Sequence, residues 1–161
     1  MLDAAGGTDI FQMAIGRLEI LSGLDAVRCV KLSARVYRWY AGCCRTPIGN
    51  TAGPGFPLFA LIHSFAEAAP DAPPLGRVLG PPRCRLFARS ATVELPPDAP
   101  PPVSAGLFLY RLRRVAGWWA RGLGRPNPFF DDKTAAPISP PHVLGAEERA
   151  ALESGIRRGG P

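Results

Sequence analysis

Two adjacent cysteines, Cys43 and Cys44, are the residues of this sequence best suited to chemistry. They follow an aromatic run and precede Pro47 and Gly49, so the stretch 38–51 predicts a strand that ends in a tight turn. Thiolates are soft, charged ligands for zinc, and a β-turn can present them without backbone strain. Neighbouring side chains of a regular strand point to opposite faces, so both sulfurs reach one ion only if the chain bends between them.

Two sulfurs do not complete a zinc site, and the alternative for each is a free thiol buried in the core. Structural zinc sites have about four ligands, whereas this turn supplies Cys43 and Cys44 at most. Two thiolates without partners bind the ion weakly and exchange it. A zinc site at this turn therefore requires further donors.

The other residues that could bind or catalyse have structural explanations. Cys29 alternates with apolar residues on a predicted strand, so we expect a small core residue. Cys84 lies between two arginines that could lower its pKa, but no base stands near it in the sequence. We expect His63 in the core or at its rim, with a substrate or metal role as the alternative. The pair Asp131 and Asp132 is typical of a solvated turn or a helix cap, so we do not expect it to act as a general acid and base.

Charge and composition narrow the classes of partner. The net charge is +6, almost entirely from arginine, but the arginines are scattered and form no run, so nucleic-acid binding is not favoured. The sequence shows no signal peptide and no apolar run of about 20 residues, so neither export nor a membrane-spanning helix is predicted. Together with four cysteines that form no disulfide framework, this predicts a cytoplasmic protein.

The first 95 residues predict an antiparallel β domain. Short alternating or β-branched segments are separated by turn residues every eight to twelve positions, which is typical of a meander. The predicted strands are 10–13, 17–21, 26–32, 36–40, 56–65 and a last one around 84–88.

The rest of the chain predicts a helical extension over residues 104–158. Five prolines make residues 96–103 and their surroundings a semi-rigid linker. Ser104 is a predicted N-cap for a helix that reaches Gly122, and a short polar helix follows at 145–155. The first helix is rich in Arg and Trp, so three roles are open: packing on the sheet, contacting a partner, or lying on an anionic membrane surface.

The turn resembles a known motif. The stretch 39–51 is similar to the C-terminal metal-binding turn of the glutathione-dependent formaldehyde-activating enzyme family, which includes centromere protein V. That family reads aromatic-Cys-x-x-Cys-Gly-Thr-Pro, and Cys44-Arg45-Thr46-Pro47 matches its second half. Arg45 replaces the glycine, and Ala41 stands where the first cysteine belongs, so Cys43 is its substitute.

The resemblance implies a β-tent-like antiparallel fold, zinc held by Cys43 and Cys44, and carbon–sulfur lyase chemistry or binding of a small thiol such as glutathione. The family's other zinc ligands lie in motifs N-terminal to this turn, and the sequence contains none of them. This predicts an incomplete, N-terminally truncated domain that is poorly metallated, with loss of the metal site by this protein as the alternative explanation. The alternative function is a non-catalytic interaction module that uses the Arg/Trp-rich helix to bind a partner or a membrane surface.

Overall fold

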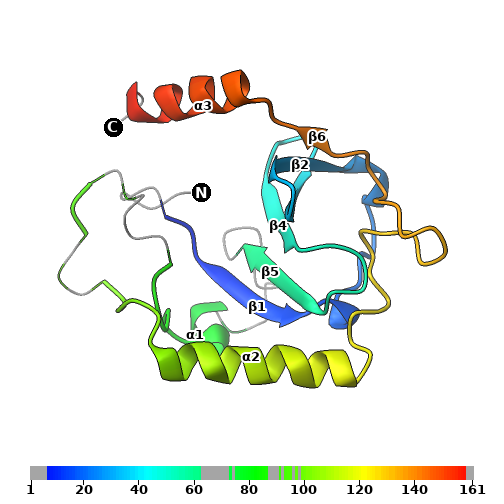
Figure 1. The fold of residues 1–161 in the computed structure, drawn as a ribbon, viewed down its shortest axis with the longest axis horizontal. Helices are drawn as coiled ribbons and strands as arrows, with labels where there is room; N and C mark the ends of the chain where they lie inside the picture. The colour runs from blue at the N-terminus through cyan, green and yellow to red at the C-terminus, as the bar shows by residue number, and fades with distance from the viewer. Residues whose placement is uncertain are drawn as a thin grey trace.

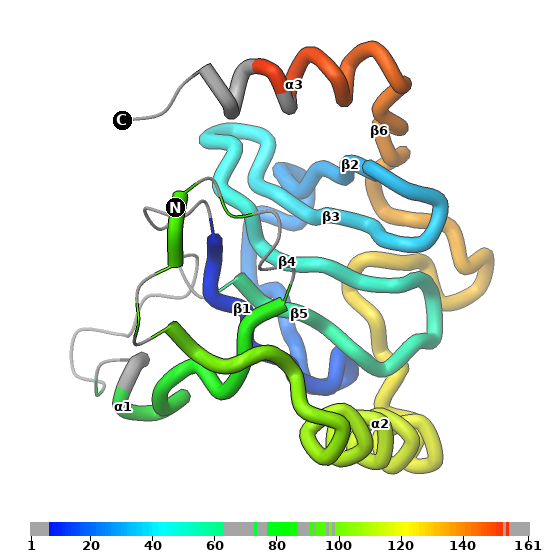
Figure 2. The backbone as a smooth tube through the Cα atoms, turned by 60° about the vertical axis from the view of Figure 1, so that its left-hand side comes forward, coloured from blue at the N-terminus to red at the C-terminus, as the bar shows by residue number. Residues whose placement is uncertain are grey.

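The computed structural model describes residues 7–62, 75–86 and 99–158, together with residues 73, 91, 93–95 and 97. The described residues form one sheet flanked by helices at its two ends (Figures 1 and 2). His63 lies outside the described residues.

The sheet has six strands in the order β1-β5-β4-β3-β2-β6. All neighbouring strands are antiparallel except β2 and β6, which are parallel. Strands β2 to β5 are a meander, because each pairs with the next strand along the chain, while β1 joins the free edge of β5. The strands are β1 Ile10–Ala14, β2 Val27–Ser33, β3 Val36–Ala41, β4 Pro47–Thr51, β5 Leu58–Ile62 and β6 His142–Val143.

The helices lie at opposite ends of the sheet. Helix α2, Ala105–Ala120, lies beyond the β1–β5 end, and α3, Ala146–Arg158, lies beyond β6 (Figures 1 and 2). The Ser104 hydroxyl caps α2 by accepting a hydrogen bond from the Leu107 amide at 3.2 Å. The short helix α1 covers Leu75–Leu79.

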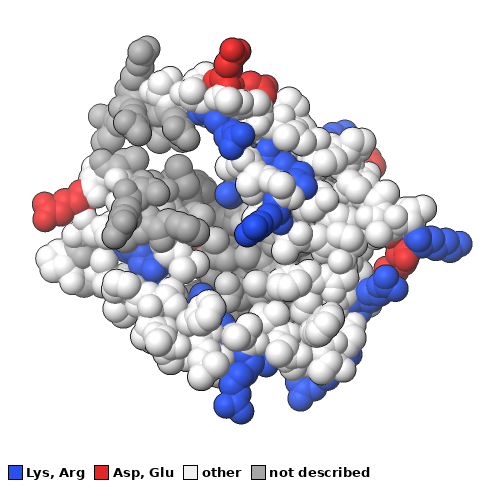
Figure 3. Space-filling view, in the orientation of Figure 1, with Lys and Arg blue, Asp and Glu red and all other residues white. Residues whose placement is uncertain are grey.

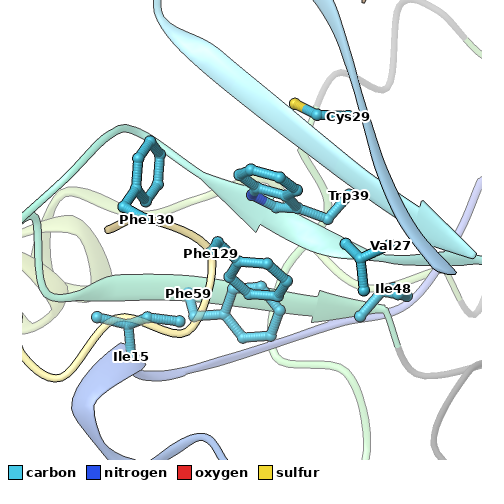
Figure 4. Close-up of a cluster of buried hydrophobic side chains, with 8 residues drawn as sticks. All are labelled: Ile15, Val27, Cys29, Trp39, Ile48, Phe59, Phe129 and Phe130. Carbon is cyan, nitrogen blue, oxygen red and sulfur yellow. The ribbon is translucent and has the colours of Figure 1, made fainter. Parts of the chain in front are cut away.

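The core is built around Trp39, which is fully buried in the middle of the sheet (Figure 4). Its ring stacks on Phe129 with centroids 4.6 Å apart and meets Phe130 edge to face at 5.6 Å. Its Nε1 donates a hydrogen bond to the Thr51 hydroxyl at 2.8 Å, which satisfies the one polar atom of the indole. The remaining members of this core are Ile15, Val27, Cys29, Ile48 and Phe59.

The segment after α2 supplies the part of this core that the sequence does not reveal. Phe129 and Phe130 are buried against β3, although they follow two prolines in a stretch without regular structure. The backbone N–H of Phe129 is satisfied by the Asn127 side chain. The core therefore joins residues of the β region to residues that follow the helix. The division of the chain at residues 95–96 stays a prediction.

The predicted fold class is confirmed: the sheet is mostly antiparallel, with a helical extension at its C-terminal side. The strands predicted at 10–13, 26–32, 36–40 and 56–65 correspond to β1, β2, β3 and β5 within the described residues, and both predicted helices are present. The strand predicted at 17–21 is wrong, because the chain there leaves a 3-10 turn at Ile15–Arg17 without pairing. In the described part of the segment 84–88, Arg85 makes only an isolated bridge to Pro102.

Strand β4 was not predicted, and Gly49 explains why. A Cβ atom at Gly49 would collide with the Phe59 ring and would approach the Ala60 carbonyl oxygen to 2.7 Å. The position therefore requires glycine for space, and a glycine interrupts the β-branched pattern by which strands are recognised.

We expect Gly49→Ala to lower the free energy of unfolding by about 2 kcal/mol, because the added methyl group overpacks the core. Denaturant unfolding of the two proteins measures the difference. Gly106→Ala is the matched control, since a Cβ atom at Gly106 would have no neighbour within 4 Å and α2 there should gain or keep its stability. Equal stability of Gly49→Ala and the unchanged chain would contradict the packing described here.

Candidate functional site

The two thiols lie on the turn between β3 and β4, whose backbone is closed by hydrogen bonds. The Ala41 amide donates to the Thr46 carbonyl at 2.9 Å, and the Arg45 amide donates to the Ala41 carbonyl at 2.7 Å. Arg45 adopts a left-handed conformation with φ of 59°, a region that favours glycine. The chain thus makes a tight bend that carries Cys43 and Cys44 at its tip.

Gly42 fixes the turn against the start of β2. Its amide donates to the Ala26 carbonyl at 2.8 Å, and a Cβ atom here would come within 2.9 Å of Arg28 Cγ. A glycine at this position lets the turn approach the neighbouring strand closely. The backbone that presents the thiols is therefore held from both sides.

Both thiols are exposed, which removes the alternative of buried core residues. The Sγ atom of Cys44 lies 3.0 Å from the Thr46 hydroxyl. Hydrogen bonds from the Thr46 side chain and backbone, and then from the Cys43 side chain, lower the pKa of Cys44 from its usual 9.0 because they stabilise the thiolate. Cys44 therefore carries more thiolate near neutral pH than an ordinary exposed cysteine.

A hollow of about 630 Å³ adjoins the turn, and Cys43 lines it together with charged residues of β2 and the turn. The Arg28 guanidinium is held there by the carbonyls of Asp25, at 2.7 Å, and Val27, at 2.9 Å. The complete lining is Asp25, Ala26, Arg28, Tyr40, Gly42, Cys43 and Arg45.

Sequence reasoning did not identify Arg28 as a neighbour of the thiols, whereas Tyr40 lies in the stretch 38–51 that carries them. Arg28 is opposite Tyr40 in the β2–β3 pairing, so only the strand register brings it to the turn. The available signal was Arg28 itself, a charged residue on a face of the predicted strand 26–32 that otherwise carries Ala26, Val30 and Leu32.

The remaining cysteines have structural roles. Cys29 is buried in the core as predicted, and burial raises its pKa to about 11, so the thiol stays protonated. Cys84 is half-buried and accepts a hydrogen bond from the Arg111 guanidinium at 3.3 Å.

The predicted aspartates also have structural roles. Asp131 caps the turn that follows it, accepting hydrogen bonds from the amides of Lys133 and Thr134, and Asp132 is exposed beside it. These contacts fit the predicted solvated turn.

The described residues offer no third donor beside the thiols. Among them, no group of three or more His, Cys, Asp or Glu residues is placed to hold a metal ion. Cys43 and Cys44 as metal ligands, and zinc as the ion, stay predictions.

The fold and the turn together define a mainly β protein that displays two vicinal thiols at a hairpin end. The chain belongs to a family of unknown function, DUF6151, whose family model matches residues 1–139. Comparisons with curated proteins and with solved structures find no match. The family match extends through α2, so the helix is part of the unit that the family shares.

The family match corrects the resemblance to the formaldehyde-activating family, which is wrong. That resemblance was anchored on Cys44-Arg45-Thr46-Pro47, where the chain turns between two strands. In the structure these residues have local structural roles. Arg45 occupies a left-handed position in the turn, and Pro47 is the first residue of β4. A short match of this kind follows from the requirements of a tight hairpin and does not require common ancestry.

In the part of the chain that the structure describes, no helix is both long enough and apolar enough to cross a membrane. The cytoplasmic location stays a prediction.

We expect Thr46→Val to raise the pKa of Cys44 toward 9.0, because the variant loses the hydroxyl that stabilises the thiolate. Below pH 9 the fraction of thiolate, and with it the rate of alkylation of Cys44, should fall, and the pH–rate profile should move to higher pH. Iodoacetamide labelling followed by fragment-ion mass spectrometry distinguishes Cys44 from Cys43.

Thr46→Ser keeps the hydroxyl and should keep the original profile. Buried Cys29 should stay unlabelled in the folded chain and so reports that each variant is folded. Superimposable profiles for the valine and serine variants would exclude the hydroxyl as the cause of the lowered pKa.

Proposed function

We propose that the Cys43–Cys44 turn is a binding site for one thiophilic cation, zinc in the first instance. The observation that supports it is the joint exposure of two adjacent sulfurs on a bend whose backbone is fixed by hydrogen bonds to Thr46 and Ala26. Such a bend meets the requirement that neighbouring side chains share one ion, which a straight strand does not. The lowered pKa of Cys44 helps, because the thiolate is the form that binds metal.

The site is open and exchangeable in this proposal. Zinc prefers four ligands, and the turn provides two. The other two positions are filled by water or by a ligand from solution. Binding is accordingly weaker than in a structural zinc site, whose closed ligand set contributes directly to folding.

A small thiol that carries carboxylates, such as glutathione, is the ligand that fits these open positions best. The hollow beside Cys43 is lined by Arg28 and Arg45, and guanidinium groups pair with carboxylates. The thiol sulfur would bind the metal and a carboxylate would bind an arginine. Of the groups that this arrangement uses, Cys43, Arg28 and Arg45 line the hollow, and Cys44 follows Cys43 on the same turn.

Metal titration tests the first part. We expect the reduced chain to bind about one Cd²⁺ or Zn²⁺ per molecule, with a sulfur-to-cadmium absorption band. Cys43→Ser and Cys44→Ser should each weaken binding at least about tenfold, because each removes half of the protein ligands.

Cys84→Ser is the matched control, since this thiol is half-buried at a distance along the chain from the turn and should leave the titration unchanged. Binding that survives in the double variant Cys43→Ser/Cys44→Ser would rule out the turn as the site.

A second titration tests the small thiol. Glutathione should raise the apparent zinc affinity of the unchanged chain, measured by competition with a chromophoric chelator, and Arg45→Gln should abolish most of that increase. Arg35→Gln is the control, because Arg35 is exposed on the β2–β3 turn, at the other end of β3 from the thiols. An equal glutathione effect in both variants would exclude Arg45 as the carboxylate partner.

A further inference from the structure

Helix α2 leaves most of one wholly apolar stripe exposed and turns toward the protein a side on which Arg111 and Arg114 lie between Leu107 and Trp118. Leu107 and Trp118 face the protein and are half-buried and buried. The apolar stripe repeats at positions i, i+4, i+7 and i+11, which places its residues on one side of a helix. It consists of Phe108, Leu112, Val115 and Trp119.

The exposure of this stripe is large for apolar side chains. Trp119 is 73% exposed, Phe108 63% and Leu112 55%, while Val115 is half-buried. Leu109, which follows Phe108 in the helix, is a further 55% exposed apolar residue beside the stripe. Phe56, on the loop between β4 and β5, is 41% exposed and adjoins the stripe. A continuous apolar surface of this kind marks a site of interaction.

The positive charge of α2 favours an anionic binding partner. Residues 105–121 contain four arginines and no Asp or Glu, and Arg113 and Arg121 are exposed. On the face shown in Figure 3, Lys and Arg side chains lie over α2 along the lower edge, and no described acidic side chain is visible there. A second copy of the chain would bring the same positive charge against this helix, which does not favour self-association through it.

The shape of the surface favours a lipid bilayer over a peptide. A groove of about 600 Å³ lies between loop residues 54–57 and the part of α2 that carries Leu112, Val115 and Trp119. Phe108 and Leu109 do not line this groove, so a peptide seated in it would leave them exposed. Helix α2 lies at the outer edge of the molecule in both ribbon and tube views, where a broad surface can cover the whole stripe (Figures 1 and 2).

We propose that α2 docks this protein on an anionic membrane surface, with Phe108, Leu112 and Trp119 inserted among the lipids and the exposed arginines at the level of the headgroups. Helices with an apolar face rich in Trp, Phe and Leu, and with arginines on the polar side, bind in this way. Trp119 is suited to the interface between lipid and water, because its ring is apolar and its N–H can stay hydrated.

Vesicle co-sedimentation of the full chain tests the proposal. The protein should bind vesicles of phosphatidylcholine mixed with phosphatidylglycerol, and should bind pure phosphatidylcholine vesicles far less. Phe108→Gln/Trp119→Gln should lower the partition coefficient at least about tenfold, because it removes the two most exposed inserted rings. Arg113→Gln/Arg121→Gln should lower it by about fivefold or more, and added salt should weaken the binding of the unchanged chain.

Matched controls and a second readout keep the outcome clear. Val143→Gln also changes an exposed apolar residue, but on β6 at the opposite end of the sheet, and should bind as the unchanged chain does. Anionic vesicles should shift Trp fluorescence to shorter wavelength in the unchanged chain and not in Trp119→Phe, since Trp39 and Trp118 are already buried.

Absence of binding to anionic vesicles overturns the proposal. Equal binding by Phe108→Gln/Trp119→Gln and by the unchanged chain also overturns it, provided that the two proteins melt at the same temperature. A concentration-dependent dimer that this double variant dissociates would instead assign the surface to a second copy of the chain. Binding of an acidic amphipathic peptide, with no binding to vesicles, would assign it to a protein partner.

Discussion

The burial of Trp39 is the constraint on which the rest of the structure depends. Its ring lies in the middle of the sheet, stacks on Phe129 and donates its only N–H to Thr51 on the adjacent strand. One side chain thus ties together β3, β4 and the segment after α2. Stacked aromatic pairs contribute about 1 kcal/mol beyond their burial, and an unsatisfied indole N–H would cost about as much or more. The segment that follows α2 is joined to the sheet through the same residue, because Phe129 and Phe130 both contact the Trp39 ring.

The geometry of the thiol turn depends on that core. Cys43 and Cys44 stand four and five residues beyond Trp39, on the continuation of a strand that Trp39 anchors. The turn itself adds hydrogen bonds from Ala41 to Thr46 and from Gly42 to Ala26. An exposed pair of sulfurs is thereby fixed at the end of a rigid hairpin, and a rigid backbone lowers the entropy that must be lost when a ligand binds. The proposed cation binding depends on this arrangement, because it holds two solvent-exposed side chains on a fixed backbone.

The sequence was sufficient where a local pattern decides the structure. Alternation identified β2, the Ser104 cap identified the start of α2, and turn residues located the exposed bend that carries the thiols. The sequence was not sufficient where the structure depends on contacts between residues that are far apart in the chain. Strand β4 contains a glycine because the Phe59 ring needs the space, and Phe129 is in the core because Trp39 offers a stacking surface, so neither follows from neighbouring residues. The lining of the hollow by Arg28 and Tyr40 likewise depends on a strand register that no single segment encodes.

The orientation of α2 shows why periodicity alone cannot assign the buried side of a helix. The stripe of Phe108, Leu112, Val115 and Trp119 is wholly apolar, whereas the side that faces the protein carries Arg111 and Arg114 between Leu107 and Trp118, so hydrophobicity alone would bury the wrong side. The chain just after the helix is held by backbone contacts: the Gly16 amide donates to the Leu123 carbonyl at 2.9 Å, and Gly124 lies so close to Gly55 that a Cβ atom there would collide with its carbonyl. Contacts of this kind do not depend on the hydrophobicity of the helix, so they are compatible with an apolar stripe that stays largely exposed. Helix α2 lies within the residues that the family shares.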